Sequence, residues 1–252
     1  GESSCPDASP LSAMQASFEK DSILVLDVDG TLTDSERIHQ RALLGAMTSL
    51  EFEDLNTDWG SYPHHTDTGI LIHAHAEHGR ALPQPHDLAR FEHEIDERFT
   101  ALLNAHGLAE IPGARAFVDA AHRSRWGVVF ATGGIRQVSH RKRRAGPIEY
   151  TDAMLITSSE YSSREQLVAE AIKRAQAGYG ITHPRAVVSI GDGMWDLKVA
   201  RRLGIDFVGI GSRRSRSPLC AEGVPVYDDM WDAMHWLTPG RGRASGIRMA
   251  SR

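Results

Sequence analysis

One short segment constrains the fold of this chain more than any other. Between residues 22 and 34, an apolar run leads directly into two aspartates one residue apart, Asp27 and Asp29, followed by Gly30 and Thr31. An apolar run of this length predicts a buried β-strand, in which residues i and i+2 point to the same side. The two carboxylates therefore share one face at the carboxyl end of the strand, where open α/β sheets bind their ligands.

The pattern of the chain changes twice after this segment. Apolar residues recur at helical spacing between about residues 36 and 110, apart from loops at 59–67 and near Pro83 and Pro85. From Pro112 to about residue 227, expected helices and strands alternate, which is typical of a parallel sheet. We therefore expect an α/β fold with a Rossmann-like parallel sheet core, helices on both faces of the sheet, and an inserted α-helical cap domain.

The helical segment is too long to be a loop in a compact domain, so we expect it to fold over the end of the first strand. Its charge also sets it apart, because residues 33–111 carry 14 acidic and 5 basic residues, whereas residues 112–240 carry 13 acidic and 18 basic ones. The expected organisation is an N-terminal arm at 1–20, a catalytic core at 21–33 and 112–240, a helical cap domain at 34–111, and a flexible basic tail at 241–252.

The composition excludes several classes of protein. With 252 residues, 41% of them hydrophobic, the chain can bury a sizeable core, and no apolar stretch approaches the roughly 20 residues of a membrane-spanning helix. No signal peptide is visible, and Cys5 and Cys220 fit no metal-ligand spacing. We therefore expect a cytoplasmic protein that binds neither membranes nor nucleic acid, because no broad basic surface is indicated.

Two later segments also end an apolar strand with polar residues. The strand at 127–131 is followed by Thr132 and Gly133, and a hydroxyl with backbone N–H groups at a strand end can bind phosphate oxygens. The strand at 186–190 is followed by Asp192 and, four residues later, by Asp196. These two carboxylates share a face if a helix begins between them, and carboxylates suit a hard cation such as Mg2+.

In type and order, these three segments resemble the signature of the haloacid dehalogenase-like (HAD) superfamily of hydrolases, most of which are phosphatases. The resemblance covers roughly residues 22–230 and is to the branch with a helical cap, which contains phosphoglycolate phosphatases and β-phosphoglucomutases. It implies that Asp27 is the nucleophile and forms an aspartyl-phosphate, and that Asp29 is the acid/base for the leaving oxygen and then for water. The residues that it implies for phosphate binding are Gly30, Thr132 and Gly133, together with a cation.

The resemblance further implies a Mg2+ site at the same strand ends. Asp27, Asp192 and the backbone carbonyl of Asp29 would bind the ion, while Asp196 would support the ion or its waters.

The cation of the family is a Lys or Arg that lies between the second and third segments. We place it at Arg164, which stands at the expected start of a helix, 28 residues before Asp192. A guanidinium there can contact phosphate through two N–H groups. Lys173, deeper in the same helix, stays open as an alternative, because the usual Lys-Pro context of the family is absent.

The sequence favours phosphoryl transfer over the other reactions of the family. Asp29 argues against dehalogenation, because haloacid dehalogenases lack the second aspartate, and the absence of lysine from residues 33–111 argues against a Schiff-base enzyme. We expect a Mg2+-dependent phosphatase acting on a small phosphorylated metabolite. Two alternatives remain: a sugar-phosphate mutase of the β-phosphoglucomutase type, whose second phosphate the acidic cap disfavours, and a non-catalytic binding protein on the same fold.

Substrate choice is expected to depend on the first cap helix and the cap loop. The residues that we consider for it are Arg37, Tyr62, His64, His65, Thr66 and Asp67. Trp195 either forms a wall of the site or packs under the cap, and the sequence does not decide between these roles. The basic run from Arg141 to Arg144 is interpreted as a solvated helix face.

Overall fold

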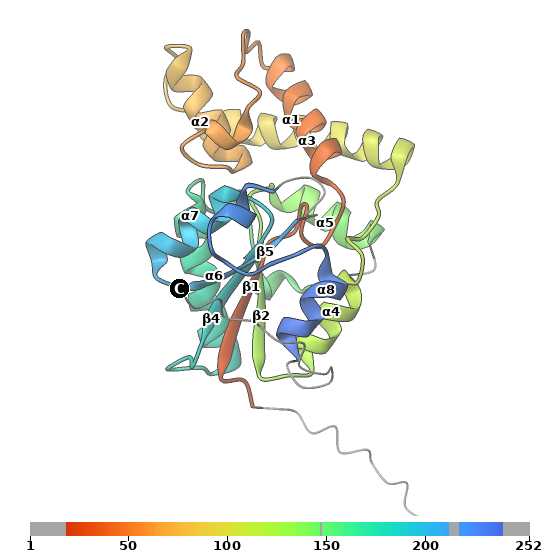
Figure 1. Cartoon of the computed structure of the whole chain (residues 1–252). Coiled ribbons are helices and arrows are strands. Elements are labelled where there is room, and N and C mark those ends of the chain that lie inside the picture. Colours follow the sequence, from red (N-terminus) through yellow and green to blue (C-terminus); the bar gives the residue numbers. More distant parts are fainter. Residues whose placement is uncertain (1–18, 147, 212–216, 239–252) are drawn as a thin grey trace, which may run out of the picture.

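A computed structural model of the chain describes residues 19–146, 148–211 and 217–238. Six strands in this part of the chain form one parallel sheet, in the order β3-β2-β1-β4-β5-β6 (Figure 1). The strands are β1 (Ser22–Leu26), β2 (Trp126–Ala131), β3 (Leu155–Ile156), β4 (Val187–Gly191), β5 (Asp206–Ile210) and β6 (Val226–Tyr227). The predicted α/β class is therefore confirmed.

The first strand lies at the point where the strand order reverses, which is the usual ligand-binding place of such sheets. All five residues of β1 are buried. Leu26 is level with Phe130 of β2 on one side and with Ile190 of β4 on the other. The residues that follow these three strands therefore meet at one edge of the sheet.

Helices cover both faces of the sheet because alternate residues of β1 are apolar on opposite sides. Leu24 and Leu26 pack with α4 and α8, whereas Ile23 and Val25 pack with α6. The core helices are α4 (Ala114–His122), α5 (Arg136–Ala145), α6 (Arg164–Tyr179), α7 (Met194–Leu203) and α8 (Met230–Leu237). The last of these, α8, has only eight residues, and our sequence analysis did not predict it.

The segment between β1 and α4 forms a group of helices beyond the carboxyl ends of the strands (orange to yellow in Figure 1). It contains α1 (Glu36–Ser49), the 3-10 turn η1 (Trp59–Ser61), α2 (Asp67–Glu77) and α3 (Pro85–His106). These elements share a buried cluster that includes Met47, Phe91 and Phe99, and Ile135 and Val138 from the start of α5 join it. The cap therefore packs directly on the core.

The limits of the described residues matter for three expectations. The basic tail expected at 241–252, and all but the last two residues of the expected N-terminal arm, lie outside them. Of the helices that the structure describes, none combines the length and the apolar character needed to span a membrane.

Candidate active site

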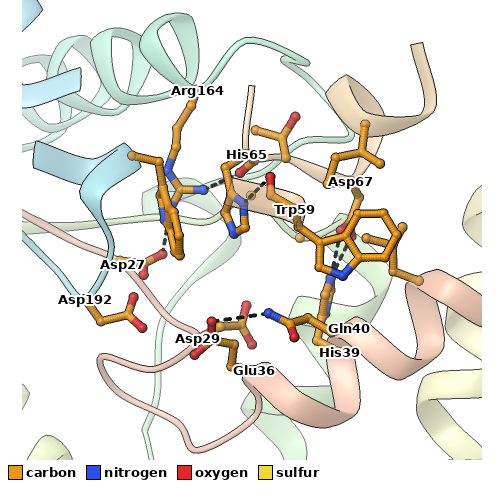
Figure 2. A pocket seen from close by; sticks show the side chains of 16 residues that line it. Asp27, Asp29, Glu36, His39, Gln40, Trp59, His65, Asp67, Arg164 and Asp192 are labelled. Atoms are coloured by element: carbon orange, nitrogen blue, oxygen red, sulfur yellow. Dashed lines mark hydrogen bonds and ion pairs between the residues drawn. The ribbon is translucent and has the colours of Figure 1, made fainter. Parts of the chain in front are cut away.

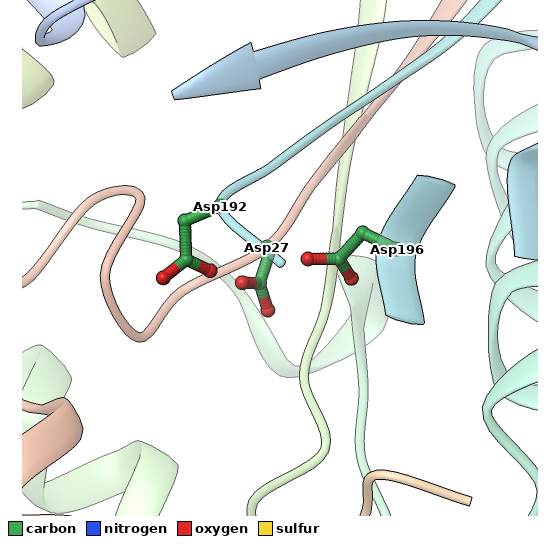
Figure 3. Close-up of side chains that lie close together, drawn as sticks. All are labelled: Asp27, Asp192 and Asp196. Atoms are coloured by element: carbon green, nitrogen blue, oxygen red, sulfur yellow. The ribbon is translucent and has the colours of Figure 1, made fainter. Parts of the chain in front are cut away.

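Three carboxylates, of which Asp27 and Asp196 are buried and Asp192 is partly buried, lie together at the edge of the sheet where β1 and β4 end (Figure 3). Asp27 follows β1, Asp192 follows β4, and Asp196 lies in the first turn of α7; one oxygen of each lies within 4.8 Å of those of the other two. Burial and then the charge of Asp196 raise the pKa of Asp27 to about 8, against the opposing effect of Arg164. Burial and the charge of Asp27 raise the pKa of Asp192 as well. Arg164 alone therefore does not balance the negative charge of the cluster.

The donor set of this cluster fits a hard divalent cation. Carboxylate oxygens are the ligands that Mg2+ prefers, and Asp192 Oδ1 is buried without a hydrogen-bond partner, which is costly unless something binds it. Asp196 is already engaged, because its carboxylate accepts from Arg164 and from the N–H of Gly193. Asp27 and Asp192 are thus the side chains that would hold the ion, and Asp196 would act beside it.

Arg164 lies next to the expected nucleophile, as the first residue of α6. Its Nη2 is 3.0 Å from Asp27 Oδ1, its Nε donates to Asp196 Oδ1 at 3.0 Å, and its Nη1 donates to the carbonyl of His65 in the cap loop at 2.7 Å. The residue is 5% exposed. Lys173, the alternative, is instead largely exposed and pairs with Glu170. The structure therefore brings Arg164, and not Lys173, to the carboxylate cluster.

Gly30 shapes the loop that follows the two aspartates. Its φ of +76° is in the left-handed region, and a Cβ there would lie 2.0 Å from Asp192 Oδ2, so a side chain is excluded on both counts. Its N–H donates to the carbonyl of Thr33 at 2.8 Å. This N–H is therefore used within the loop, and the expected role of Gly30 in phosphate binding stays a prediction.

The second motif lies beside the same cluster, at the end of β2. The hydroxyl of Thr132 is buried and accepts from the N–H of Gly134 at 3.2 Å. The backbone of Gly133 is close to the cap: a Cβ there would lie 2.5 Å from Arg164 Nη1 and 2.6 Å from the carbonyl oxygen of His65. A glycine at this position lets the core, the cap loop and the guanidinium meet.

A largely buried row of polar and charged groups connects Asp29 to the cap. Lys142 Nζ lies 2.6 Å from Asp29 Oδ1 and 3.1 Å from His39 Nδ1, and His39 Nε2 lies 2.8 Å from Asp67 Oδ1. Because an ammonium group has no lone pair, Nδ1 of His39 accepts and its Nε2–H donates to Asp67. Asp67 also accepts from the backbone N–H of Ile135 at 3.1 Å.

This row sets the ionisation of the expected acid/base. Burial alone would raise the pKa of Asp29, but the charge of Lys142, with hydrogen bonds from Lys142 and Ser35, holds that pKa well below its usual range. Asp29 is therefore ionised in the structure, with its carboxylate turned to Lys142.

The expectation that Arg141 to Arg144 form a solvated face is wrong for Lys142, which is only 1% exposed. The buried residues of α5 are Val138, Ser139 and Lys142, so the lysine lies on the core-facing side at helical spacing. Arg141 pairs with Asp96 of the cap helix α3 at 3.0 Å. Our sequence analysis missed Lys142 because its neighbours are basic, although the spacing from Val138 was a usable signal.

A cavity lies between the cap and the carboxylate cluster (Figure 2). Its floor contains Asp27, Asp29, Asp192 and Arg164. Its roof is one face of α1 together with the cap loop and the start of α2, and the residues of this roof are Glu36, His39, Gln40, Leu43, Trp59, His65, Thr66, Asp67 and Ile70.

Comparison with known proteins agrees with this geometry. Residues 22–204 match the sequence model of a hydrolase family, the haloacid dehalogenase-like hydrolases. The chain belongs to the haloacid dehalogenase-like hydrolase family. A search of curated proteins found no match to the sequence.

Solved structures of the same fold span nearly the whole chain. A hydrolase from Pseudomonas syringae is 21% identical with a TM-score of 0.66, over 86% of this chain and 97% of its own. CbbY from Rhodobacter sphaeroides, solved in complex with phosphate, is 18% identical with a TM-score of 0.63, over 84% and 96%. A predicted phosphoglycolate phosphatase from Haemophilus somnus is 13% identical with a TM-score of 0.61, over 87% and 99%. At these identities the likeness establishes the fold alone.

The structure of this HAD-like hydrolase separates the expected specificity residues into two groups. His65, Thr66 and Asp67 line the cavity. Tyr62 and His64 line an adjoining hollow, where Tyr62 is buried and donates to the carbonyl of Asn56. Arg37 is exposed and lines neither of them.

Trp195 fulfils both of the roles left open by the sequence. It lines the cavity, and its ring stacks on His65 of the cap loop with centroids 3.7 Å apart.

Burial and the nearby charge of Arg164 lower the pKa of His65 to about 4, so this imidazole is neutral at pH 7. Its Nδ1–H donates to the carbonyl of Trp59 at 3.1 Å.

One face of α1 carries four cavity residues that were not among the expected site residues. Glu36, His39, Gln40 and Leu43 follow each other at i, i+3, i+4 and i+7, which is the spacing of one helix face. The helix begins seven residues after Asp29, so this face was a signal that the sequence contained.

Proposed function

We propose that this HAD-like hydrolase is a Mg2+-dependent phosphatase that cleaves a small phosphorylated metabolite through an aspartyl-phosphate. The observation that supports the proposal most directly is the position of Asp27 on the cavity floor, 3.0 Å from the buried guanidinium of Arg164 and beside Asp192. The bound phosphate of CbbY and the name of the Haemophilus somnus protein agree with it.

Each residue has a definite part in the proposed reaction. An oxygen of Asp27 attacks phosphorus, and a bond to Asp27 forms as the ester P–O bond breaks. Asp29, which is ionised at rest, relays a proton from solvent to the alcohol oxygen that leaves. Water then attacks the acyl phosphate with Asp29 as base, which releases inorganic phosphate and regenerates Asp27. Arg164 offsets the charge of the phosphoryl group.

The ion held by Asp27 and Asp192 would supply positive charge that favours the ionised carboxylates and further offsets the phosphoryl charge. The raised pKa values of these two groups agree with this need. A phosphatase fits better than a mutase, because no lysine or arginine lies among the cap residues that line the described cavity. A mutase has to bind a second phosphate there.

The test is hydrolysis of p-nitrophenyl phosphate, with and without Mg2+, by the wild-type protein and by Asp27→Asn. We expect Mg2+-dependent turnover that chelation abolishes and that Asp27→Asn lacks, and a phosphoryl adduct on Asp27 in rapid-quench mass spectrometry. Asp119→Asn, on the exposed surface of α4, is the matched control and keeps full activity. Wild-type turnover by Asp27→Asn would show that Asp27 is not the nucleophile.

A further inference from the structure

The cap side of the cavity has an unusual chemical character for an enzyme that binds anions. Its polar side chains are Glu36, His39, Gln40, Thr66 and Asp67, and the indoles of Trp59 and Trp195 also line the cavity. The imidazole that stacks on Trp195 is the neutral His65. Positive charge is confined to the floor, so a group bound under the cap meets an anion and flat apolar rings.

From this lining we infer that the substrate is a phosphate monoester whose alcohol part carries no negative charge and presents a hydroxyl or ammonium donor to Glu36. The inference rests on the proposed phosphatase function and narrows its substrate class. It excludes esters that carry a carboxylate or a second phosphate on the alcohol part.

The surroundings of Glu36 support this assignment. Glu36 is the first residue of α1, and its carboxylate accepts a hydrogen bond from Gln40 Nε2 at 3.3 Å (Figure 2). Within the described part of the chain, no lysine, arginine or histidine lies within ion-pair distance of it. Burial and the carboxylates of Asp29 and Asp196 raise its pKa, because each of these opposes a negative charge.

The other charged groups near the cavity are already paired. Asp67 accepts from His39 and from the N–H of Ile135, and Lys142 is committed to Asp29. Arg164 contacts Asp27 and Asp196 at the phosphoryl position. Glu36 is therefore the charged side chain that remains to meet the alcohol part, and a second anion would face it without a compensating cation.

Three phosphate esters of nearly equal length test which charge on the alcohol part the site accepts. O-phosphoethanolamine, 2-hydroxyethyl phosphate and 2-phosphoglycolate end in an ammonium, a hydroxyl and a carboxylate. We expect kcat/KM, measured from released phosphate, to be at least about tenfold lower for the carboxylate ester than for the hydroxyl ester. The kcat/KM of the ammonium ester should equal or exceed that of the hydroxyl ester. If turnover of all three is too slow to measure, their inhibition constants against p-nitrophenyl phosphate give the same order.

The residue is tested by Glu36→Gln, with Glu97→Gln as the matched control. Glu97 is an exposed cap residue on α3 that pairs with His93, so both variants remove one negative charge from the cap. Glu36→Gln should reduce the hydroxyl-to-carboxylate ratio at least about fivefold, while Glu97→Gln leaves it unchanged. Because the ratio is taken within one variant, a loss of folded protein does not affect it.

Different results overturn the two proposals. A wild-type protein that prefers the carboxylate ester, or a Glu36→Gln variant with an unchanged ratio, refutes the role of Glu36 and leaves it as a helix N-terminal acid. In either case the phosphatase function still stands if p-nitrophenyl phosphate is hydrolysed. Absence of that hydrolysis with Mg2+ refutes the proposed function itself.

Discussion

Replacement of Lys142 by Met removes a charge from the buried row while keeping most of the volume of the side chain. The ammonium lies 2.6 Å from Asp29 Oδ1, and its lysine side chain is 1% exposed. It also lies 5.3 Å from the ring centroid of Phe99. Since methionine preserves the packing of the stem, the effect of Lys142→Met measures chiefly the loss of charge.

The expected cost follows from the burial of the two partners. Removing one member of a buried ion pair costs about 3–5 kcal/mol, because the other charge stays uncompensated. Asp29 is 18% exposed at its side chain and keeps a hydrogen bond from Ser35, which places the cost near the lower end, about 3 kcal/mol. For a protein of this size that corresponds to a fall in Tm of about 6–12 °C.

Urea unfolding followed by circular dichroism measures this cost, with Lys173→Met as control. Lys173 is 70% exposed and pairs with Glu170 on the surface, and such pairs contribute at most about 1 kcal/mol. The double variant Asp29→Asn/Lys142→Met should be more stable than the sum of the single changes predicts, by at least about 1.5 kcal/mol. A cost of Lys142→Met no larger than that of Lys173→Met, or additive single effects, would refute this account of the pair.

The pH dependence gives a second check with a definite sign. The pKa of Asp29 is depressed in the folded protein, so its stabilisation is present above the unfolded pKa of about 3.9 and is lost as the pH falls through the folded value. In Lys142→Met the folded pKa of Asp29 rises, and the variant regains stability as the carboxyl takes up a proton. The stability difference between the wild-type protein and Lys142→Met should therefore shrink as the pH is lowered from 7 to 4.

Three further predictions concern other parts of the site. Gly30→Ala should destabilise the protein by more than about 2 kcal/mol in urea unfolding, because φ is +76° and the added Cβ would lie 2.0 Å from a carboxylate oxygen of Asp192. The control, Gly180→Ala, should cost only about 1 kcal/mol, because φ is +68° but no atom lies within 4 Å of the added Cβ. Because the pKa of His65 is lowered to about 4, the unfolded chain binds more protons than the folded protein between pH 6.5 and 4. The free energy of unfolding of the wild-type protein should therefore fall over this range, and that of His65→Gln should fall less. Equal slopes of unfolding free energy against pH for the two proteins would contradict the burial of a neutral ring. Arg164→Met should lower kcat at least about 100-fold in phosphate release with circular dichroism unchanged, and a near-normal kcat would remove Arg164 from the reaction.

The sequence was sufficient for the fold and for the carboxylate cluster because both depend on local patterns. Apolar strands that end in polar residues are visible in any parallel sheet, and the level ends of β1, β2 and β4 follow from their pairing. Once the strands are known, Asp27 and Asp192 have to meet. The expected helices of the core agree with the observed ones within a few residues.

The cap face of the site was not predictable in the same way. Tyr62 and His64 were natural candidates from their polarity and loop position, yet the chain turns them into an adjoining hollow. Lys142 lies in a run of basic residues, which is typical of an exposed helix face. Its burial depends on a partner 113 residues earlier in the chain, Asp29. The spacing from Val138 indicates that Lys142 faces the core, but no local pattern identifies Asp29 as its partner, because that pairing depends on how α5 packs on the rest of the fold.

The uneven charge of the chain acquires a physical meaning in the site. Among the described residues, the buried cations are Arg164 and Lys142, and both come from the segment after residue 112, where basic residues exceed acidic ones. The cap, with 14 acidic and 5 basic residues between 33 and 111, contributes Glu36 to the cavity. An acidic cap over a site for anions would be unfavourable if the cap had to bind the phosphoryl group. It is favourable if the core alone neutralises that group and the cap receives the alcohol part, because the cap then repels any substrate with a second anion before catalysis begins.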